Sequence, residues 1–94
     1  VNDSFVMNKW AKDQGVEKIK MIPDGTGTFT RQMGMLVDKS NLGFGMRSWR
    51  YAMVVKDGVI ERLFVEPGMR DNATDDPYGE TSPQVIIDYL KKTV

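Results

Sequence analysis

The chain has 94 residues, which is enough for one small domain. Lys plus Arg equal Asp plus Glu, 13 against 13, so the charge balance gives no reason to expect a nucleic-acid or membrane partner. No apolar run approaches the roughly 20 residues that cross a bilayer, and no basic-then-apolar leader is present. From these features we expect a cytoplasmic protein.

Histidine and cysteine are both absent from the chain. Their absence excludes a Cys/His zinc site, a Ser–His–Asp triad, a thiol nucleophile and a disulfide within these residues. We expect no cofactor and no metal ion. Any catalysis confined to this chain would rest on carboxylates, Lys, Arg, Tyr or hydroxyl groups.

The first predicted element is a helix with Asp3 or Ser4 as its N-cap and Gly15 at its C-terminal end. It carries an apolar stripe that we expect to pack in the core, formed by Val6, Met7, Trp10 and Ala11. Residues 16–22 follow, and their content of Val, Ile and Met predicts a short strand that ends at Pro23.

Residues 24–28 predict a turn that leads into a brief helix, in which Phe29 and Met33 face the same way. The turn holds two glycines and two threonines, as some phosphate-binding loops do. It lacks the Gly-Lys-Ser/Thr ending of a P-loop and the third glycine of a dinucleotide fingerprint. We therefore interpret it as a turn and helix cap.

Residues 34–46 predict a loop with a short strand over residues 35–37. Within this loop, Leu42 and Phe44 form an apolar patch flanked by glycines. The ordinary interpretation is that Phe44 packs into the core. The alternative is that the patch lines the wall of a pocket near Arg50.

Residues 47–66 predict a β-hairpin around Asp57-Gly58, which supplies the positive φ angles that a tight turn needs, and Pro67 ends it. In the first strand Arg50 alternates onto a face with apolar residues. A guanidinium stays charged, so it needs an anionic or strongly accepting partner there. Two interpretations follow: Arg50 forms a structural salt bridge, or it holds an anion in a site.

Residues 68–81 are long and polar, with a group of carboxylates that lacks the alternating pattern of a calcium loop, so we interpret them as a solvated loop. A final helix opens at Ser82-Pro83, and its apolar stripe comprises Val85, Ile86, Tyr89 and Leu90. The order helix, strand, helix, hairpin, helix predicts an α/β layer structure with a mixed sheet. Its abrupt start leads us to expect that part of the domain is missing upstream.

Four segments of the chain, in order, resemble the C-terminal part of the type-5 peroxiredoxins: residues 1–10, 22–29, 47–58 and 65–68. These are thiol peroxidases of the redoxin group in the thioredoxin superfamily, and the resemblance covers nearly the whole chain. It implies a partial thioredoxin-like fold without its N-terminal half. Residues 1–94 would then be the C-terminal part of a single redoxin domain.

The resemblance also implies an activity, the reduction of hydrogen peroxide and organic hydroperoxides by a peroxidatic cysteine, with glutathione, glutaredoxin or thioredoxin as reductant. Arg50 matches the family's catalytic arginine, and a guanidinium both favours a thiolate and donates to the peroxide oxygens. Leu42 and Phe44 match the loop that walls the peroxide pocket, so we expect them to contact the substrate. Arg47 matches a second, less diagnostic basic position.

The family's Pro-x-x-x-Thr-x-x-Cys segment, which carries the nucleophile, is not in this sequence. Two hypotheses remain open. In the first, the chain is part of a peroxiredoxin and is inactive alone; in the second, it is a cysteine-free module that binds a partner or self-associates without catalysis. In both cases an unpaired sheet edge and bare apolar surface predict a homo-oligomer.

Overall fold

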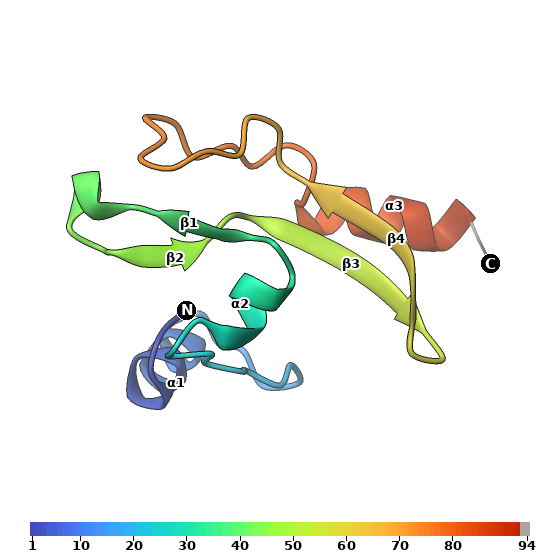
Figure 1. The fold of residues 1–94 in the computed structure, drawn as a ribbon. Helices are drawn as coiled ribbons and strands as arrows, with labels where there is room; N and C mark the ends of the chain where they lie inside the picture. The colour runs from blue at the N-terminus through green and yellow to red at the C-terminus, as the bar shows by residue number, and fades with distance from the viewer. Residues whose placement is uncertain (93–94) are drawn as a thin grey trace.

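The computed structural model describes residues 1–92. Its elements follow in the order α1 (Ser4–Asp13), α2 (Thr28–Gln32), β1 (Leu36–Asp38), the 3-10 helix η1 (Ser40–Leu42), β2 (Met46–Ser48), β3 (Tyr51–Lys56), β4 (Val59–Val65) and α3 (Pro83–Lys92). Strands β1 and β2 form one end of an extended ribbon, β3 and β4 continue it, and α3 lies beside β4 (Figure 1). The loop between β4 and α3 returns over β1 and β2.

The predicted helices are all present. Asp3 is the N-cap of α1 and accepts a hydrogen bond from the Val6 amide at 2.8 Å, and Gly15 has φ +67° just after the helix. The turn before α2 is a cap, as interpreted: the Asp24 carboxylate accepts hydrogen bonds from the amide and hydroxyl of Thr30. The Thr30 hydroxyl, and then its amide, lower the pKa of Asp24.

The apolar stripe of α1 is less buried than expected. In α1 only Ala11 is buried, and Val6 and Trp10 are about half exposed. In α3 no described residue is fully buried. The expectation of core packing is therefore wrong for most of the α1 stripe, in which Ala11 alone is buried.

The strand predicted at residues 16–22 is also wrong. This segment has no strand beside it in the described part of the chain, and the Val16 amide instead donates to Ala11 O at the end of α1, at 2.9 Å. Residues 1–92 contain two separate two-stranded antiparallel sheets, β1–β2 and β3–β4, instead of the predicted mixed sheet. The α/β class itself is confirmed.

The predicted hairpin is present as β3 and β4, with Asp57 and Gly58 at φ +52° and +77° in its turn. Its first strand is shorter than predicted. Residues 46–48 belong to β2 and pair with β1, so Leu36 lies opposite Ser48. Trp49 and Arg50 form the short link between β2 and β3, and Arg50 therefore lies just before the hairpin strand.

The core is small and centred on Trp49. Four buried residues form one cluster, namely Met35, Val37, Trp49 and Ala73. The side chain of Trp49 connects this cluster to the residue that follows β4, because its indole N–H donates to the backbone oxygen of Glu66 at 2.7 Å. This contact joins the link between the two sheets to the end of the hairpin.

The most buried side chain is a carboxylate. Glu66 is 1% exposed and accepts hydrogen bonds from the amides of Gly79, Glu80 and Thr81 and from the Thr81 hydroxyl, at 2.6–3.0 Å. Burial alone raises the pKa of Glu66, but the Thr81 hydroxyl and the three amides together outweigh it and hold the pKa below its ordinary value. Glu66 therefore fixes the end of the loop that precedes α3.

A pH dependence of stability follows from this carboxylate. Because its pKa is lowered in the folded state, Glu66 contributes stability above its ordinary pKa of 4.5, and this contribution is lost as the pH falls through the folded value. We expect E66Q to lower the Tm by several degrees at pH 7 and to flatten the acid limb of Tm against pH, measured by circular dichroism. Glu80→Gln is the matched control, because Glu80 is exposed and contributes its backbone amide. Equal pH profiles for E66Q and E80Q would contradict the assignment.

Candidate functional site

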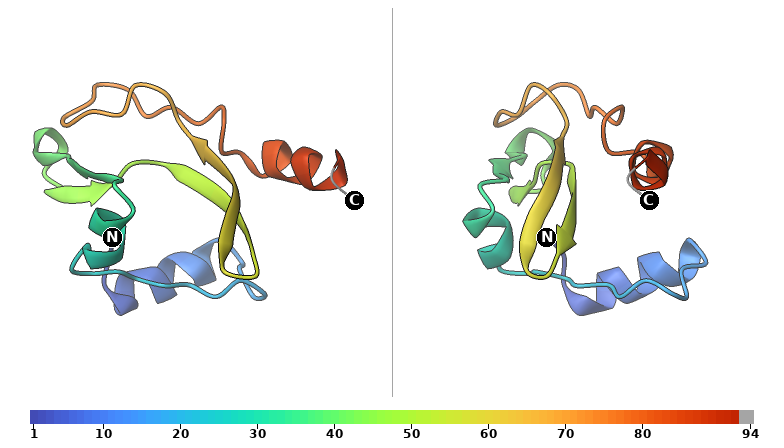
Figure 2. Two further views of the ribbon diagram at one scale, coloured as in Figure 1. Left: turned by 45° about the vertical axis from the view of Figure 1, so that its right-hand side comes forward. Right: turned by 90° about the vertical axis from the view of Figure 1, so that its right-hand side faces the viewer.

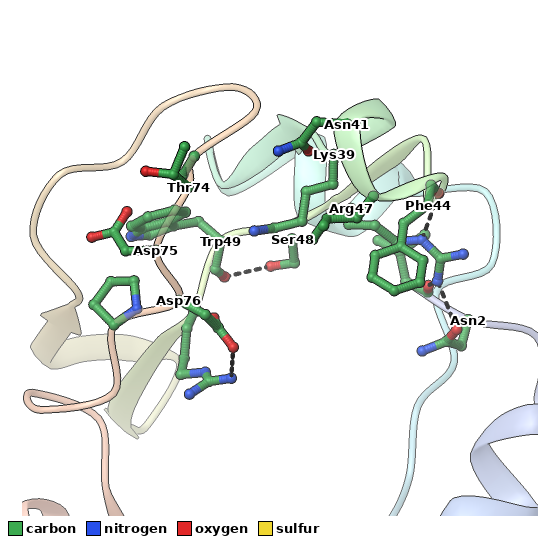
Figure 3. A pocket seen from close by; sticks show the side chains of 15 residues that line it. Asn2, Lys39, Asn41, Phe44, Arg47, Ser48, Trp49, Thr74, Asp75 and Asp76 are labelled. Carbon is green, nitrogen blue, oxygen red and sulfur yellow. Dashed lines mark hydrogen bonds and ion pairs between the residues drawn. The ribbon is translucent and has the colours of Figure 1, made fainter.

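A cavity of about 540 Å³ opens beside the core cluster. Four segments line it: residues 1–2, 39–44, 47–50 and 73–77. Figure 3 shows Thr74, Asp75 and Asp76 on one side of the cavity, with Phe44, Arg47 and Asn2 on the other. Residues distant in sequence therefore meet here because β1, β2 and the loop after β4 pack on Trp49.

Arg50 lies on the wall of this cavity. Its side chain is 38% exposed, and Nη2 is 3.1 Å from an Oδ of Asp76. The guanidinium carbon lies 4.5 Å from the centre of the Tyr78 ring, which is a cation–π distance. The prediction that Arg50 lies within the first strand of the hairpin is wrong, since it lies in the link before β3. The predicted acidic partner exists, and it stands at the cavity.

Leu42 and Phe44 also line the cavity, and they are 59% and 55% exposed. The interpretation that Phe44 packs into the core is therefore wrong, and its position agrees with the pocket-wall alternative. Leu42 ends the 3-10 helix η1, whose first turn is held by Asp38. The hydroxyl of Ser40, and then its amide, lower the pKa of Asp38.

Arg47 has a structural place that sequence reasoning did not identify. Its side chain donates to Phe44 O at 2.9 Å, to Asn2 Oδ1 at 2.7 Å and to Val1 O. It also lies over the Phe44 ring, 5.8 Å from its centre. These contacts join the start of the chain to the loop that carries Phe44, so Arg47 holds one wall of the cavity together.

The opposite wall is held at both of its ends. At the start of the loop after β4, Asp71 accepts a hydrogen bond from the Asp38 amide at 2.8 Å. The Asn72 amide donates to Asp38 O, and the Asn72 side-chain oxygen accepts from the Asn41 amide. At the end of the loop, Glu66 binds residues 79–81. We call the segment between these anchors, residues 73–78, the strap. Nothing in the sequence pattern pointed to it, because its anchors depend on backbone groups brought together by folding.

The site combines positive side chains with an apolar wall. Lys39, Arg47 and Arg50 line the cavity together with Asp75 and Asp76. Lys39 lies over the Trp49 ring at 5.6 Å, and Arg47 is engaged by its acceptors. The arrangement is suited to binding a small polar molecule beside Arg50, and the nucleophile for a thiol reaction is not among the residues of this chain.

Comparison with known proteins places the chain in a family. The family model described as Redoxin matches residues 1–79. This chain belongs to the redoxin family. A curated peroxiredoxin from Rhizobium etli is 62% identical to the redoxin chain over 91 residues, which cover 97% of this chain and 51% of the relative.

Solved structures agree with this placement. The Plasmodium falciparum antioxidant protein, a 1-Cys peroxiredoxin, matches with a TM-score of 0.90 and 38% identity, over 97% of this chain and 53% of that one. Reduced Prx3 from Vibrio vulnificus in complex with hydrogen peroxide matches with a TM-score of 0.83 and 35% identity, over 98% and 52%. The redoxin chain thus spans about half the length of these proteins. Among residues 1–92, no helix has the length and apolar character to cross a membrane.

The contacts of Arg47 lead to a prediction about this redoxin chain. Replacing Arg47 by Gln removes charged donors from partly buried acceptors, which should lower the free energy of unfolding by about 2 kcal/mol. Urea denaturation followed by tryptophan fluorescence measures the change. Arg31→Gln is the matched control, because Arg31 is exposed in the last turn of α2. A loss no larger than that of R31Q would show that Arg47 does not hold the wall.

Proposed function

We propose that this redoxin chain supplies the arginine side of a thiol peroxidase site that reduces hydrogen peroxide and organic hydroperoxides. The thiolate would come from a cysteine outside these residues, and residues 1–94 would be the C-terminal part of a single redoxin domain. The observation that carries the proposal is that Leu42, Phe44 and Arg50, the residues that the family resemblance assigned to the site, line one cavity. A related structure holds hydrogen peroxide, which supports the choice of substrate.

The chemistry assigns a role to each of these residues. The thiolate attacks one peroxide oxygen, the O–O bond breaks, and the leaving alkoxide or hydroxide takes a proton from water. Sulfur is oxidised to a sulfenic acid, and two thiol equivalents later reduce it. Arg50 would favour the thiolate and stabilise the negative charge that develops on the leaving oxygen. Leu42 and Phe44 would give the peroxide an apolar wall and limit access of water.

The finer assignments belong to the same proposal. Glutathione, glutaredoxin or thioredoxin would be the reductant, the cytoplasm would be the compartment, and the working assembly would be a homo-oligomer such as a dimer. They rest on the family resemblance. The balanced charge of the chain supports the expectation of no nucleic-acid partner.

A chimera tests the proposed activity. The matched part of the Rhizobium etli peroxiredoxin would be replaced by this chain, so that the relative's own remaining half supplies the cysteine segment. We expect the chimera to turn over hydrogen peroxide in an assay that follows thiol consumption, and the 94-residue chain alone to be inactive. In the chimera, R50Q should lower kcat/KM by about 10²–10³-fold, because it removes the charged donor.

The controls separate charge from geometry. R50K keeps the charge without the planar pair of donors, so its rate should lie between those of the chimera and R50Q. R31Q changes the same charge far from the cavity lining and should leave the rate near that of the parent chimera. A folded chimera in which R50Q is as active as the parent would overturn the role of Arg50.

A second candidate function, self-association without catalysis, is favoured by one face of the β3–β4 ribbon. Met53 lies opposite Leu63, and Val55 lies opposite Ile60, so these four apolar side chains share one face. Val55, Ile60 and Leu63 are 49%, 47% and 41% exposed. Helix α3 lies beside the ribbon (Figure 2). It is on the other face, because its Tyr89 ring meets the Phe64 ring at 5.5 Å. The apolar face is therefore open to a partner.

Concentration-dependent association tests this candidate. We expect the chain to form dimers or larger species as its concentration rises from about 1 to 100 µM, a range that suits modest apolar interfaces. Ile60→Gln should weaken the association at least several-fold. Val59→Gln is the matched control, because Val59 is exposed on the opposite face of the same strand. Light scattering that shows a monomer throughout would contradict this candidate.

A further inference from the structure

The guanidinium of Arg50 already has an anionic partner inside the site. Asp76 reaches it at 3.1 Å, and both residues line the cavity. The Asp76 side chain is 71% exposed, so its carboxylate stays hydrated and is not committed to the core. A dashed line in Figure 3 marks this contact at the edge of the cavity. Among the side-chain hydrogen bonds of residues 1–92, this is the one made by the Arg50 guanidinium.

The fold, and not the ion pair itself, places Asp76 there. An exposed pair of this kind contributes little stability and would not by itself order a loop. The strap is fixed instead by the Asp71 and Asn72 contacts before it and by the Glu66 carboxylate after it. Ala73, its first residue, is 5% exposed and packs in the core cluster. Asp76 is therefore held near Arg50 whether or not the two charges interact.

Two neighbours of Asp76 in the strap, Asp75 and Tyr78, make different contacts. Asp75 pairs with Arg70 at 3.0 Å, so it is directed to another cation although it lines the same cavity. Tyr78 stacks on the guanidinium of Arg50 and limits the planes that this group can adopt. The Asp76 carboxylate thus binds one edge of the Arg50 guanidinium, and the Tyr78 ring packs against the face of the same group.

We infer that Asp76 is a specificity-determining residue, which occupies part of the Arg50 donor set and so makes the cavity disfavour free anions relative to uncharged hydroperoxides. The inference rests on the proposed function. A sulfate or phosphate ion at Arg50 would have to displace Asp76 or bind against its like charge. A neutral peroxide meets no such repulsion and needs one or two of the remaining guanidinium donors. The neutral Arg50–Asp76 pair therefore filters ligands by charge.

Anion binding by the full 94-residue chain tests the inference, and it requires no thiolate. Sodium sulfate would be titrated into the chain at constant ionic strength, with the dissociation constant read from ¹⁵N NMR shifts of the Arg50 side chain and the Trp49 indole. We expect D76N to bind sulfate about fivefold more tightly than the parent, because loss of a competing exposed ion pair is worth a factor of this order. D75N removes the same charge from the same cavity lining and should change the affinity much less.

Further variants show whether the effect passes through Arg50. The double variant R50Q/D76N should lose the gain, Tyr78→Phe should retain it, and Tyr78→Leu in the D76N background should reduce it. D76S provides a second neutral variant if D76N alters the spectrum of the whole chain. Equal tightening in D76N and D75N, retention of the gain in R50Q/D76N, or no sulfate binding by any variant would overturn the inference. None of these results bears on turnover by the chimera, so failure of this inference is distinguishable from failure of the proposed function.

Discussion

The buried carboxylate of Glu66 is the interaction on which the arrangement of the site depends. It gathers the amides of residues 79–81 at the end of the strap, while its own backbone oxygen accepts from the Trp49 indole. One residue therefore connects the end of the hairpin, the core and the loop before α3. Without it, the strap would be fixed at its first end alone, and Asp76 and Tyr78 would have no defined place beside Arg50. Hydrogen bonds to one residue, through both its backbone and its side chain, thus tie Trp49, the neighbour of Arg50, to the end of the strap.

The sequence predicted the local elements better than their assembly. Asp3, Gly15 and the Asp57-Gly58 turn are determined by neighbouring residues, because caps and turns depend on local φ angles and hydrogen bonds, and all three lie where expected. The strand at residues 16–22 could not be judged in this way, since a strand needs a partner, and the described part of the chain provides none. The exposure of the α1 stripe has the same cause: periodicity identifies an apolar face but not what covers it.

In the candidate site too, some features could be predicted from the sequence and others depend on how the chain folds. Resemblance assigns Arg50, Leu42 and Phe44 to a site, and the need of a guanidinium for an anionic partner predicts an acidic neighbour. Which carboxylate would fill that role was not predictable, because the loop of residues 68–81 holds several, and folding selects Asp76 by anchoring the strap at both ends. The resemblance marks Arg47 as a less diagnostic basic position, and its acceptors are backbone and amide oxygens whose positions no sequence pattern encodes.

Trp49 and Arg50 are consecutive residues in the short link between the two sheets, and one is 3% exposed while the other faces the cavity. A single peptide unit thus joins the buried indole to the guanidinium that lines the cavity. A larger side chain at Ala73, which belongs to the same core cluster as Trp49, would therefore disturb packing directly beside Arg50. The small hydrophobic interior thus adjoins the cavity wall, with a single residue step from the packed indole to the guanidinium.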